Sequence, residues 1–167
     1  GIHTRPTTDR IKETLFNMIH NNIYNSTFLD LFSGSGGIGI EALSRGAKKA
    51  VFIDNNPKAI LCIKENLQRT KLYDLSKVYQ MDAFSSINKL ENDNMIFDIL
   101  FIDPPYNKSI ERQILALIAN SRIINQESII IVETDIKTSF DYIDDYQMEI
   151  YKEKKYKTNK HVFIRKK

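Results

Sequence analysis

An acidic residue, two prolines and an aromatic follow one another directly after a mostly apolar run in this chain. The run covers residues 97–102, and the four residues are Asp103-Pro104-Pro105-Tyr106. Each proline fixes its own φ, lacks an N–H and pushes the preceding residue toward an extended conformation, so a rigid corner is expected. Asp103 offers a carboxylate acceptor, and Tyr106 offers a flat apolar face with a polar tip. Such a corner is suited to grip a planar group that carries an NH2, for example a nucleobase.

A glycine-rich segment with the spacing G-x-G-x-x-G follows another apolar run. Its three glycines are Gly34, Gly36 and Gly39, and the acid Asp54 follows at about the 20-residue distance typical of dinucleotide sites. Glycines let a ligand approach the backbone closely. A carboxylate at the tip of the second strand matches the two hydroxyl donors of a ribose. These residues therefore predict a site for a nucleoside cofactor.

Two further acids favour a cationic cofactor. Asp30 lies in the first strand just before the glycines, where a carboxylate disfavours a pyrophosphate and favours a positive charge. Asp82 ends the third strand and could accept from an adenine amine, although it could equally cap the helix that follows. S-adenosylmethionine carries an ammonium and a sulfonium, whereas NAD carries two phosphates. The acids therefore suit S-adenosylmethionine better than NAD.

Hydrophobic periodicity places these motifs at the ends of predicted strands. Helices are predicted over residues 8–23, 38–45, from 57 onward, 84–90 and 110–119, and strands over residues 28–32, 50–54, 78–82, 97–102, 128–133, 148–154 and 161–165. Strands that alternate with helices and are apolar on both faces predict an α/β fold with a mostly parallel, doubly covered sheet. The last two strands have only a short connection, which forces antiparallel pairing.

Length and composition are those of one ordinary globular domain covering residues 1–167. The chain is 42% apolar and 27% charged. It contains no apolar run near the ~18 residues that a membrane span needs, and no signal peptide is visible at its start. Its one cysteine, Cys62, and the lack of a zinc-spaced Cys/His cluster argue against a disulfide or a metal site. We therefore expect a cytoplasmic monomer without metal or membrane contact.

Positive charge is concentrated near the C-terminus, although the net charge is only +3. The basic residues there are Lys152, Lys154, Lys155, Lys157, Lys160, Arg165, Lys166 and Lys167. With Tyr151, Tyr156 and His161 between them, they could contact nucleic acid. They could equally protect a sheet edge, because lysines block edge-to-edge pairing. The sequence leaves both interpretations open.

Three blocks of the sequence resemble class I methyltransferases, and more narrowly the RsmD family. Residues 5–17 (RPTTDRIKETLFN) match the family's opening helix, residues 30–47 match its cofactor loop and following helix, and Asp103-Pro104-Pro105-Tyr106 matches its catalytic motif. The resemblance covers residues 5 to about 134. The opening block is its most specific part, because Asp-Pro-Pro-Tyr is shared with other amino-group methyltransferases.

The chain departs from the family pattern at both ends. Family members usually begin with a basic β-hairpin before the Arg-Pro-Thr block, so this chain is expected to be a fragment that lacks it. Near the C-terminus the family tends to carry Tyr-Gly-Asp-Thr, whereas here Tyr156 is followed by Lys157-Thr158-Asn159. The role of the C-terminal hairpin is therefore the least certain part of the resemblance.

The resemblance implies a Rossmann-like class I methyltransferase fold, a doubly wound, mostly parallel seven-stranded sheet with an antiparallel C-terminal hairpin. It also implies methyl transfer from S-adenosylmethionine to the N2 amine of a guanine in 16S ribosomal RNA, either free or within the small ribosomal subunit. Asp103 and the carbonyl of Pro104 would accept the two amine N–H groups, and Tyr106 would stack on the base.

Further site residues follow from the same resemblance. Asn55 and Ala83 would join the cofactor site beside Asp54 and Asp82. Arg5, Thr7 and Arg10 would contact RNA phosphates or the cofactor carboxylate. The alternative is structural, with Thr7 or Thr8 capping the first helix and Arg10 pairing with Glu13.

Three other functions compete with this assignment. A DNA adenine-N6 methyltransferase also uses Asp-Pro-Pro-Tyr, but it usually needs an added target-recognition region for which 167 residues leave no room. A NAD-dependent oxidoreductase would explain the glycines but neither the proline corner nor the antiparallel end. A domain that binds the cofactor without turnover stays open if the family's N-terminal hairpin is required for activity.

Overall fold

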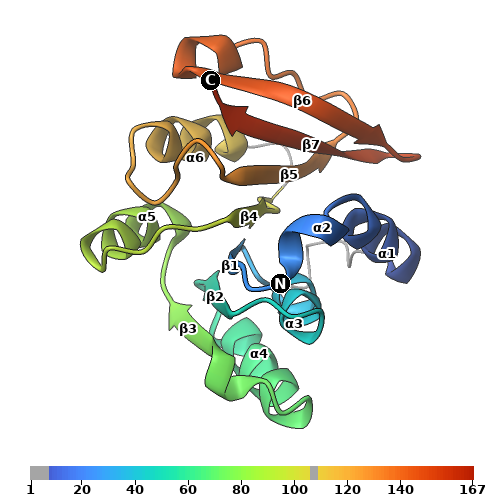
Figure 1. The fold of residues 1–167 in the computed structure, drawn as a ribbon, viewed down its shortest axis with the longest axis vertical. Helices are drawn as coiled ribbons and strands as arrows, with labels where there is room; N and C mark the ends of the chain where they lie inside the picture. The colour runs from blue at the N-terminus through green and yellow to red at the C-terminus, as the bar shows by residue number, and fades with distance from the viewer. Residues whose placement is uncertain (1–7, 106–108) are drawn as a thin grey trace.

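The computed structural model describes residues 8–105 and 109–167, and its centre is one seven-stranded sheet with the strand order β3-β2-β1-β4-β5-β7-β6 (Figure 1). The strands are β1 (Thr27–Leu31), β2 (Lys49–Asp54), β3 (Ser76–Gln80), β4 (Ile99–Ile102), β5 (Ile129–Asp135), β6 (Met148–Lys155) and β7 (Asn159–Lys166). Strands β1 to β5 are parallel, and β7 runs antiparallel to both β5 and β6. The predicted doubly wound sheet with an antiparallel C-terminal hairpin is confirmed.

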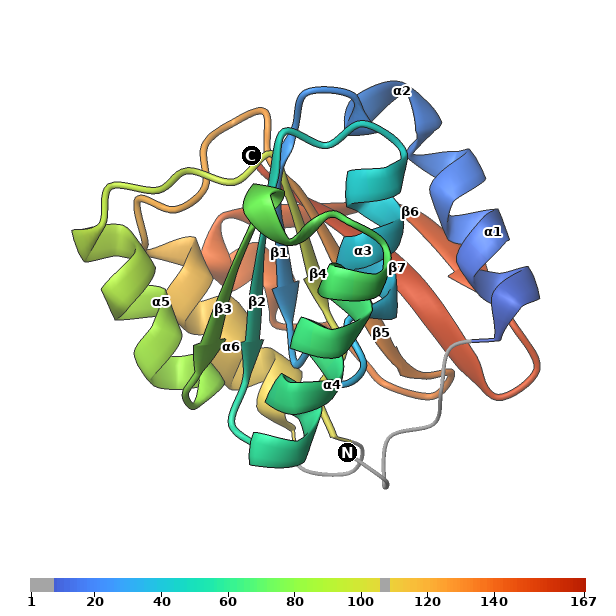
Figure 2. The ribbon, with the colours of Figure 1, turned by 90° about the horizontal axis from the view of Figure 1, so that it is seen from below.

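Helices cover both faces of the sheet. The α-helices are α1 (Asp9–Met18), α2 (His20–Ile23), α3 (Gly37–Ser44), α4 (Pro57–Arg69), α5 (Ala83–Asn92) and α6 (Ile110–Ala119), and the short 3-10 helices are η1 (Tyr73–Leu75) and η2 (Ile143–Tyr146). Helices α5 and α6 lie on one side of the sheet, and α1 to α4 lie on the other (Figure 1). Turned by 90°, the same arrangement shows α3 and α4 lying across the central strands (Figure 2).

Two apolar layers hold these helices on the sheet, because successive side chains of a strand point to opposite faces. Leu31 and Ile102 belong to the layer that contacts α5 and α6. Phe28, Phe52 and Phe101 belong to the layer that contacts α1, α3 and α4. All five are fully or almost fully buried. Both faces of the central strands are therefore core, which is why these strands read as continuous apolar runs in the sequence.

The predicted helix over residues 8–23 is wrong at one point, because the helix is interrupted. Helix α1 ends at Met18, and Ile19 leaves helical geometry with φ −110° and ψ 14° before α2 begins. Both Ile19 and Ile23 are buried, with 2% of each exposed. The break turns the chain so that both side chains reach the core just before β1. The apolar spacing continues through the break, so periodicity alone gave no sign of it.

The third strand also differs from its prediction. It covers Ser76–Gln80, two residues earlier than the predicted range, and its polar start pairs in register with Ala50 and Val51 of β2. Strand β3 lies at the edge of the sheet, and each of its residues is either partly buried or exposed. Its first residues are therefore polar and escaped a search for apolar runs. Asp82 lies outside the strand and begins α5 instead.

The lysine-rich C-terminal segment forms the other edge of the sheet. Strand β6 is the last strand of the order, and Lys152, Lys154 and Lys155 are exposed on it. This placement agrees with the edge-protection interpretation. Lys160 differs from the others, because only 7% of it is exposed and its Nζ lies 3.9 Å from Glu153.

No helix among the described residues has the length and apolar character needed to cross a membrane.

Candidate active site

The candidate site lies where the strand order of the sheet reverses. Strand β1 is flanked by β2 on one side and β4 on the other, and Leu31 pairs in register with Ile102. The loops that follow β1 and β4 therefore leave the sheet side by side, and the N–H of Asp103 donates to the carbonyl of Leu31 at 3.4 Å. In open α/β sheets such a switch point is where ligands bind. The glycine loop and the Asp-Pro-Pro corner meet at this point.

The glycine loop is held by the carboxylate of Asp54 at the end of β2. One oxygen of Asp54 accepts from the N–H of Gly34 at 2.9 Å, and the other accepts from the N–H of Asn56 at 2.9 Å. Gly34 and Gly36 adopt positive φ angles of 56° and 83°, a region that favours glycine. The predicted cofactor residue Asn55 follows Asp54 directly and is exposed. The loop conformation thus depends on the same acid that the sequence assigns to a ribose.

Gly39 of helix α3 lies directly against side chains of β1 and β2. A Cβ placed on it would lie 2.4 Å and 2.7 Å from two ring atoms of Phe52, and 3.2 Å from Oδ2 of Asp30. Phe52 is fully buried, so its ring has no free space into which to move. Only glycine fits at this position without displacing α3 from β2.

We expect Gly39→Ala to destabilise the protein by about 1–3 kcal/mol, because the added methyl group overpacks the contact with Phe52. Gly37→Ala is the matched control: its Cβ would meet only Ser35 Oγ at 3.6 Å, and alanine is the better helix former by about 1 kcal/mol. Chemical denaturation of both variants measures the difference. Equal stabilities would contradict the assigned contact.

Asp30 is a buried carboxylate beneath the glycine loop. It is 2% exposed, and its Oδ2 accepts from the N–H of Gly39 at 2.9 Å. Burial raises the pKa of Asp30 to about 8; the hydrogen bond from Gly39 opposes this shift and the nearby charge of Asp54 adds to it. A buried carboxyl group with a raised pKa is a suitable neighbour for a bound cation, because a positive charge would stabilise its ionised form.

Asp82 caps helix α5. Its carboxylate accepts from the N–H of Phe84 at 2.8 Å, the N–H of Ser85 at 3.4 Å and the hydroxyl of Ser85 at 2.6 Å. The hydroxyl bond from Ser85 is the largest cause of the lowered pKa of Asp82. The capping alternative is therefore confirmed, and contact with an adenine amine stays a prediction. Ala83 follows as the first residue of α5 and is buried.

Asp82→Ala should lower the free energy of unfolding by about 0.5–2 kcal/mol, the usual cost of losing an N-cap. Asp82→Ser should recover most of this loss, because serine is also a good cap. The two variants also distinguish helix capping by Asp82 from contact with the adenine of the cofactor. Calorimetric titration with S-adenosylhomocysteine should show weaker binding by both variants if the carboxylate also contacts adenine, and unchanged binding if it is only a cap.

The Asp-Pro-Pro corner follows β4, as predicted. Asp103 is partly buried, Pro104 is buried and Pro105 is exposed. Burial raises the pKa of Asp103 well above its usual value, and the charges of Glu133 and Asp30 raise it further. Tyr106, predicted to stack on a base, lies outside the described residues. The corner therefore places a strong proton acceptor beside the glycine loop.

The opening block is described only from Thr8 onward, so the predictions for Arg5 and Thr7 lie outside the described residues. The hydroxyl of Thr8 accepts from the N–H of Ile11 at 3.2 Å, which confirms that Thr8 caps α1. Arg10 is exposed, and the alternative ion pair from Arg10 to Glu13 is not formed in the described structure. Arg10 thus remains available to contact a ligand.

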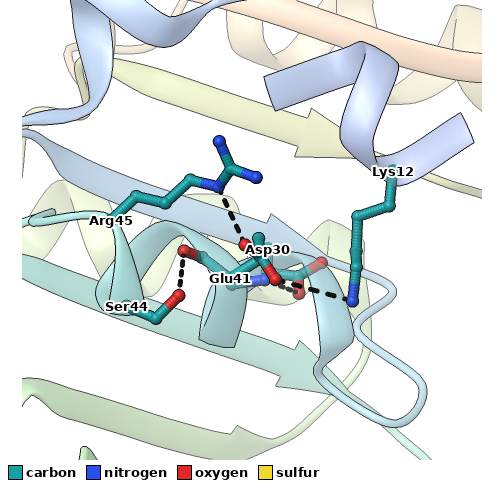
Figure 3. A network of polar contacts seen from close by, with 6 residues as sticks. Lys12, Asp30, Glu41, Ser44 and Arg45 are labelled. Atoms are coloured by element: carbon teal, nitrogen blue, oxygen red, sulfur yellow. Dashed lines mark hydrogen bonds and ion pairs between the residues drawn. The ribbon is translucent and has the colours of Figure 1, made fainter. Parts of the chain in front are cut away.

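An ion-pair network fastens α1 to the cofactor helix. Glu41 of α3 lies between Lys12 of α1 at 3.6 Å and Arg45 at 2.8 Å (Figure 3). The guanidinium of Arg45 also lies over the ring of Phe16, 5.1 Å from its centroid. Helix α1, which carries the exposed Arg10, is therefore tied to the helix that follows the glycine loop.

Two parts of the site were not predicted from the sequence. Ser33 links β1 to β2, since its hydroxyl donates to the carbonyl of Asp30 and accepts from the N–H of Ile53 at 3.0 Å. Glu133 lies near the end of β5, in the strand next to the one that Asp103 follows, and its carboxylate lies 2.7 Å from His161 of β7. An acid at the end of an apolar strand is the signal that singled out Asp103, and the same signal at Glu133 could have found it.

The residues at the loop fit S-adenosylmethionine. A Cβ on Gly34 would meet no atom within 4 Å, so the space next to the loop is open to a ligand. The carboxylate of Asp54 accepts from the N–H of Gly34, and that of Asp30 accepts from the N–H of Gly39. Two carboxylates so close to the loop would repel a pyrophosphate. The described residues contain no group of three or more His, Cys, Asp or Glu side chains that could hold a metal ion.

Comparison with known proteins agrees with this site. The family model described as "Conserved hypothetical protein 95" matches residues 1–165. The chain is 40% identical over 135 residues to YlbH of Bacillus subtilis, which is provisionally named an rRNA methyltransferase; the match covers 81% of this chain and 73% of YlbH. It is 36% identical to ribosomal RNA small subunit methyltransferase D of Buchnera aphidicola, over 81% of this chain and 69% of that protein.

A solved structure is similar over nearly its whole length. It is a conserved hypothetical protein of Streptococcus pyogenes with a TM-score of 0.84 and 31% identity, and the match covers 93% of this chain and 95% of that one. The sheet order, the glycine loop and the Asp-Pro-Pro corner are thus found in a chain that a family model matches almost end to end. The chain belongs to the RsmD family of S-adenosylmethionine-dependent rRNA methyltransferases.

Proposed function

We propose that this protein transfers a methyl group from S-adenosylmethionine to the N2 amine of a guanine in 16S ribosomal RNA. The observation that carries the proposal is the position of Asp103. It leaves the end of β4 directly beside the loop that follows β1, and its N–H bonds to Leu31. A base gripped by the Asp-Pro-Pro corner would therefore lie next to the donor held at the glycine loop.

The amine of guanine is a weak nucleophile, because its lone pair is delocalised into the ring. Asp103 and the carbonyl of Pro104 would accept the two N–H groups of the amine and favour a pyramidal nitrogen with its lone pair directed outward. Tyr106 would stack on the base, which is worth about 1–3 kcal/mol in comparable sites. S-adenosylmethionine supplies an electrophilic methyl group on a positively charged sulfur. The rate would come mainly from positioning and from electrostatics.

The target guanine must be unstacked before the corner can hold it. A base inside a helix hides its amine in the minor groove, so enzymes that modify a base act on unpaired nucleotides or flip the base out. The exposed Arg10 on α1 is a candidate to hold the RNA backbone, since arginine pairs well with phosphate. Arg5 and Thr7, which lie outside the described residues, are candidates for the same role. The names of the relatives support rRNA as the substrate class.

A methyl-transfer assay tests the proposal. The full chain is incubated with tritiated S-adenosylmethionine and, in separate reactions, with 30S subunits, naked 16S rRNA and DNA, and the products are digested to nucleosides. Label is expected in N2-methylguanosine from one of the two RNA substrates. Label in adenine, or in DNA alone, would overturn the guanine assignment and support the DNA adenine methyltransferase alternative.

Calorimetry separates the remaining alternatives. S-adenosylhomocysteine should bind and NAD should not, whereas the reverse result would support an oxidoreductase. Tight binding of S-adenosylhomocysteine with no label in any nucleic acid would indicate a domain that binds the cofactor without turnover.

A further inference from the structure

A buried acid–base pair lies behind the candidate site. Oε1 of Glu133, near the end of β5, lies 2.7 Å from Nε2 of His161 on β7. Only 2% of Glu133 and 0% of His161 are exposed. The His161 ring lies edge-on to Phe101 and Tyr156, with centroid distances of 5.9 Å and 5.3 Å. Such a pair is costly to bury, so its position calls for an explanation.

Asp103 directly after β4, Glu133 on β5 and His161 on β7 lie at matching positions across three neighbouring strands of the sheet. Ile102, the last residue of β4, pairs with Val132, so Asp103 and Glu133 each come one residue later. Glu133 in turn pairs in register with His161. Side chains alternate along a strand, so Asp103 lies on the same face as Phe101, the ring that contacts His161. The three titratable groups therefore line one face of the sheet at the edge where the candidate site lies.

The hydrogen bonding of His161 indicates a neutral ring. Its Nε2 faces the carboxylate of Glu133, and its buried Nδ1 has no hydrogen-bond partner in the described structure. A buried N–H without a partner costs more than a buried acceptor without one, so we assign the proton to Nε2. The carboxylate of Glu133 lies in buried surroundings, where water screens its charge little.

Other titratable groups around Asp103 are few in the described elements. Asp30 faces it from β1 and Glu133 from β5, and both charges raise the pKa of Asp103 in addition to its burial. His161 on β7 and Tyr156 beyond it lie on the far side of Glu133. Removing the charge of Glu133 should therefore lower the proton affinity of Asp103.

We propose that Glu133, held in place by His161, is a positioning residue that makes Asp103 a stronger acceptor for the proton that the methylated amine releases. The inference rests on the proposed function. In the reaction a bond forms between N2 and the methyl carbon, and the carbon–sulfur bond breaks with its electron pair left on sulfur. The nitrogen then gives one proton to the carboxylate of Asp103, which later releases it to solvent. Glu133 touches neither reactant and acts only through the charge of Asp103.

The test measures the proton affinity of Asp103 directly, in the full chain labelled with carbon-13 at its aspartate carboxyl groups. Glu133→Gln keeps the shape and the hydrogen bonding of the side chain but removes its charge. The titration midpoint of Asp103 should move to lower pH by about one unit or more. The acid limb of the single-turnover pH–rate profile should move in the same direction, with unchanged affinity for S-adenosylhomocysteine. A midpoint that stays in place overturns the inference.

Two more variants guard against a simple loss of structure. Glu149→Gln is the matched control, because Glu149 pairs with Arg165 on the neighbouring hairpin, and it should move neither the midpoint nor the profile. His161→Phe keeps a ring in the core but removes the donor to Glu133, so it should lower kcat without raising KM for rRNA. His161→Gln, which restores a donor N–H, should recover part of kcat. Equal kcat for all His161 variants would also overturn the inference.

The outcomes separate this inference from the proposed function. A wild-type chain that labels no guanine rejects the proposed function, whatever the titration of Asp103 shows. A wild-type chain that labels guanine, with a midpoint that Glu133→Gln does not move, rejects the inference alone.

Discussion

Replacement of Asp103 by alanine is expected to reduce the rate of methyl transfer by about 10³-fold while leaving cofactor binding intact. The expected magnitude is that of removing one positioned group that interacts with the reacting centre. Asp103 would hold the amine and receive its proton, whereas the cofactor loop is held by Asp30 and Asp54. Single-turnover transfer of a tritiated methyl group measures the rate, and calorimetry with S-adenosylhomocysteine measures the binding.

Asp103→Asn sharpens the same experiment, because asparagine keeps the shape of the side chain and one acceptor oxygen. It cannot take a proton, so its rate should stay close to that of alanine if proton acceptance matters, and should rise well above it if holding the amine is enough. Asp74→Ala is the control, since Asp74 is exposed on η1. Unchanged turnover in Asp103→Ala would remove Asp103 from the mechanism.

The parts of the site that depend on local sequence were predictable. Gly34, Gly36 and Gly39 lie within six residues of the chain, so the spacing that identifies the loop is contained in one short segment of sequence. Asp103 could be placed because it follows a mostly apolar run, and the carboxyl ends of parallel strands share one edge of the sheet. Neither prediction required knowledge of which strands are neighbours.

The parts that depend on strand order were not predictable from pattern alone. Glu133 and His161 are far apart in sequence, and they meet only because β7 inserts antiparallel beside β5. Lys160 illustrates the same limit: within a stretch of exposed lysines it is buried, because β7 lies between β5 and β6. Composition indicated a charged edge, but only the sheet order decides which residue of the hairpin is inside.

The buried acid Asp30 should couple the stability of the protein to pH. Its pKa in the folded protein is about 8 against an ordinary value of 3.8. Between these values the folded protein keeps a proton that the unfolded chain has lost, so the ligand-free protein becomes less stable as the pH rises toward about 8. Each unit of pKa difference corresponds to about 1.4 kcal/mol, so the total loss is on the order of several kcal/mol. Asp30→Asn cannot ionise and should show a much flatter dependence in denaturation experiments across this pH range.

Binding of the cofactor should draw the same proton off Asp30. A positive charge beside the carboxylate favours its ionised form, so binding below a pH of about 8 should release close to one proton and tighten about tenfold per pH unit. Above that pH the affinity should level off, because Asp30 is then already ionised. Calorimetry of S-adenosylmethionine binding in two buffers of different ionisation enthalpy counts the released proton. In Asp30→Asn both the proton release and the pH dependence should disappear. An affinity in the wild-type chain that does not change between about pH 6 and about pH 8 would show that Asp30 does not face the positive charge of the cofactor.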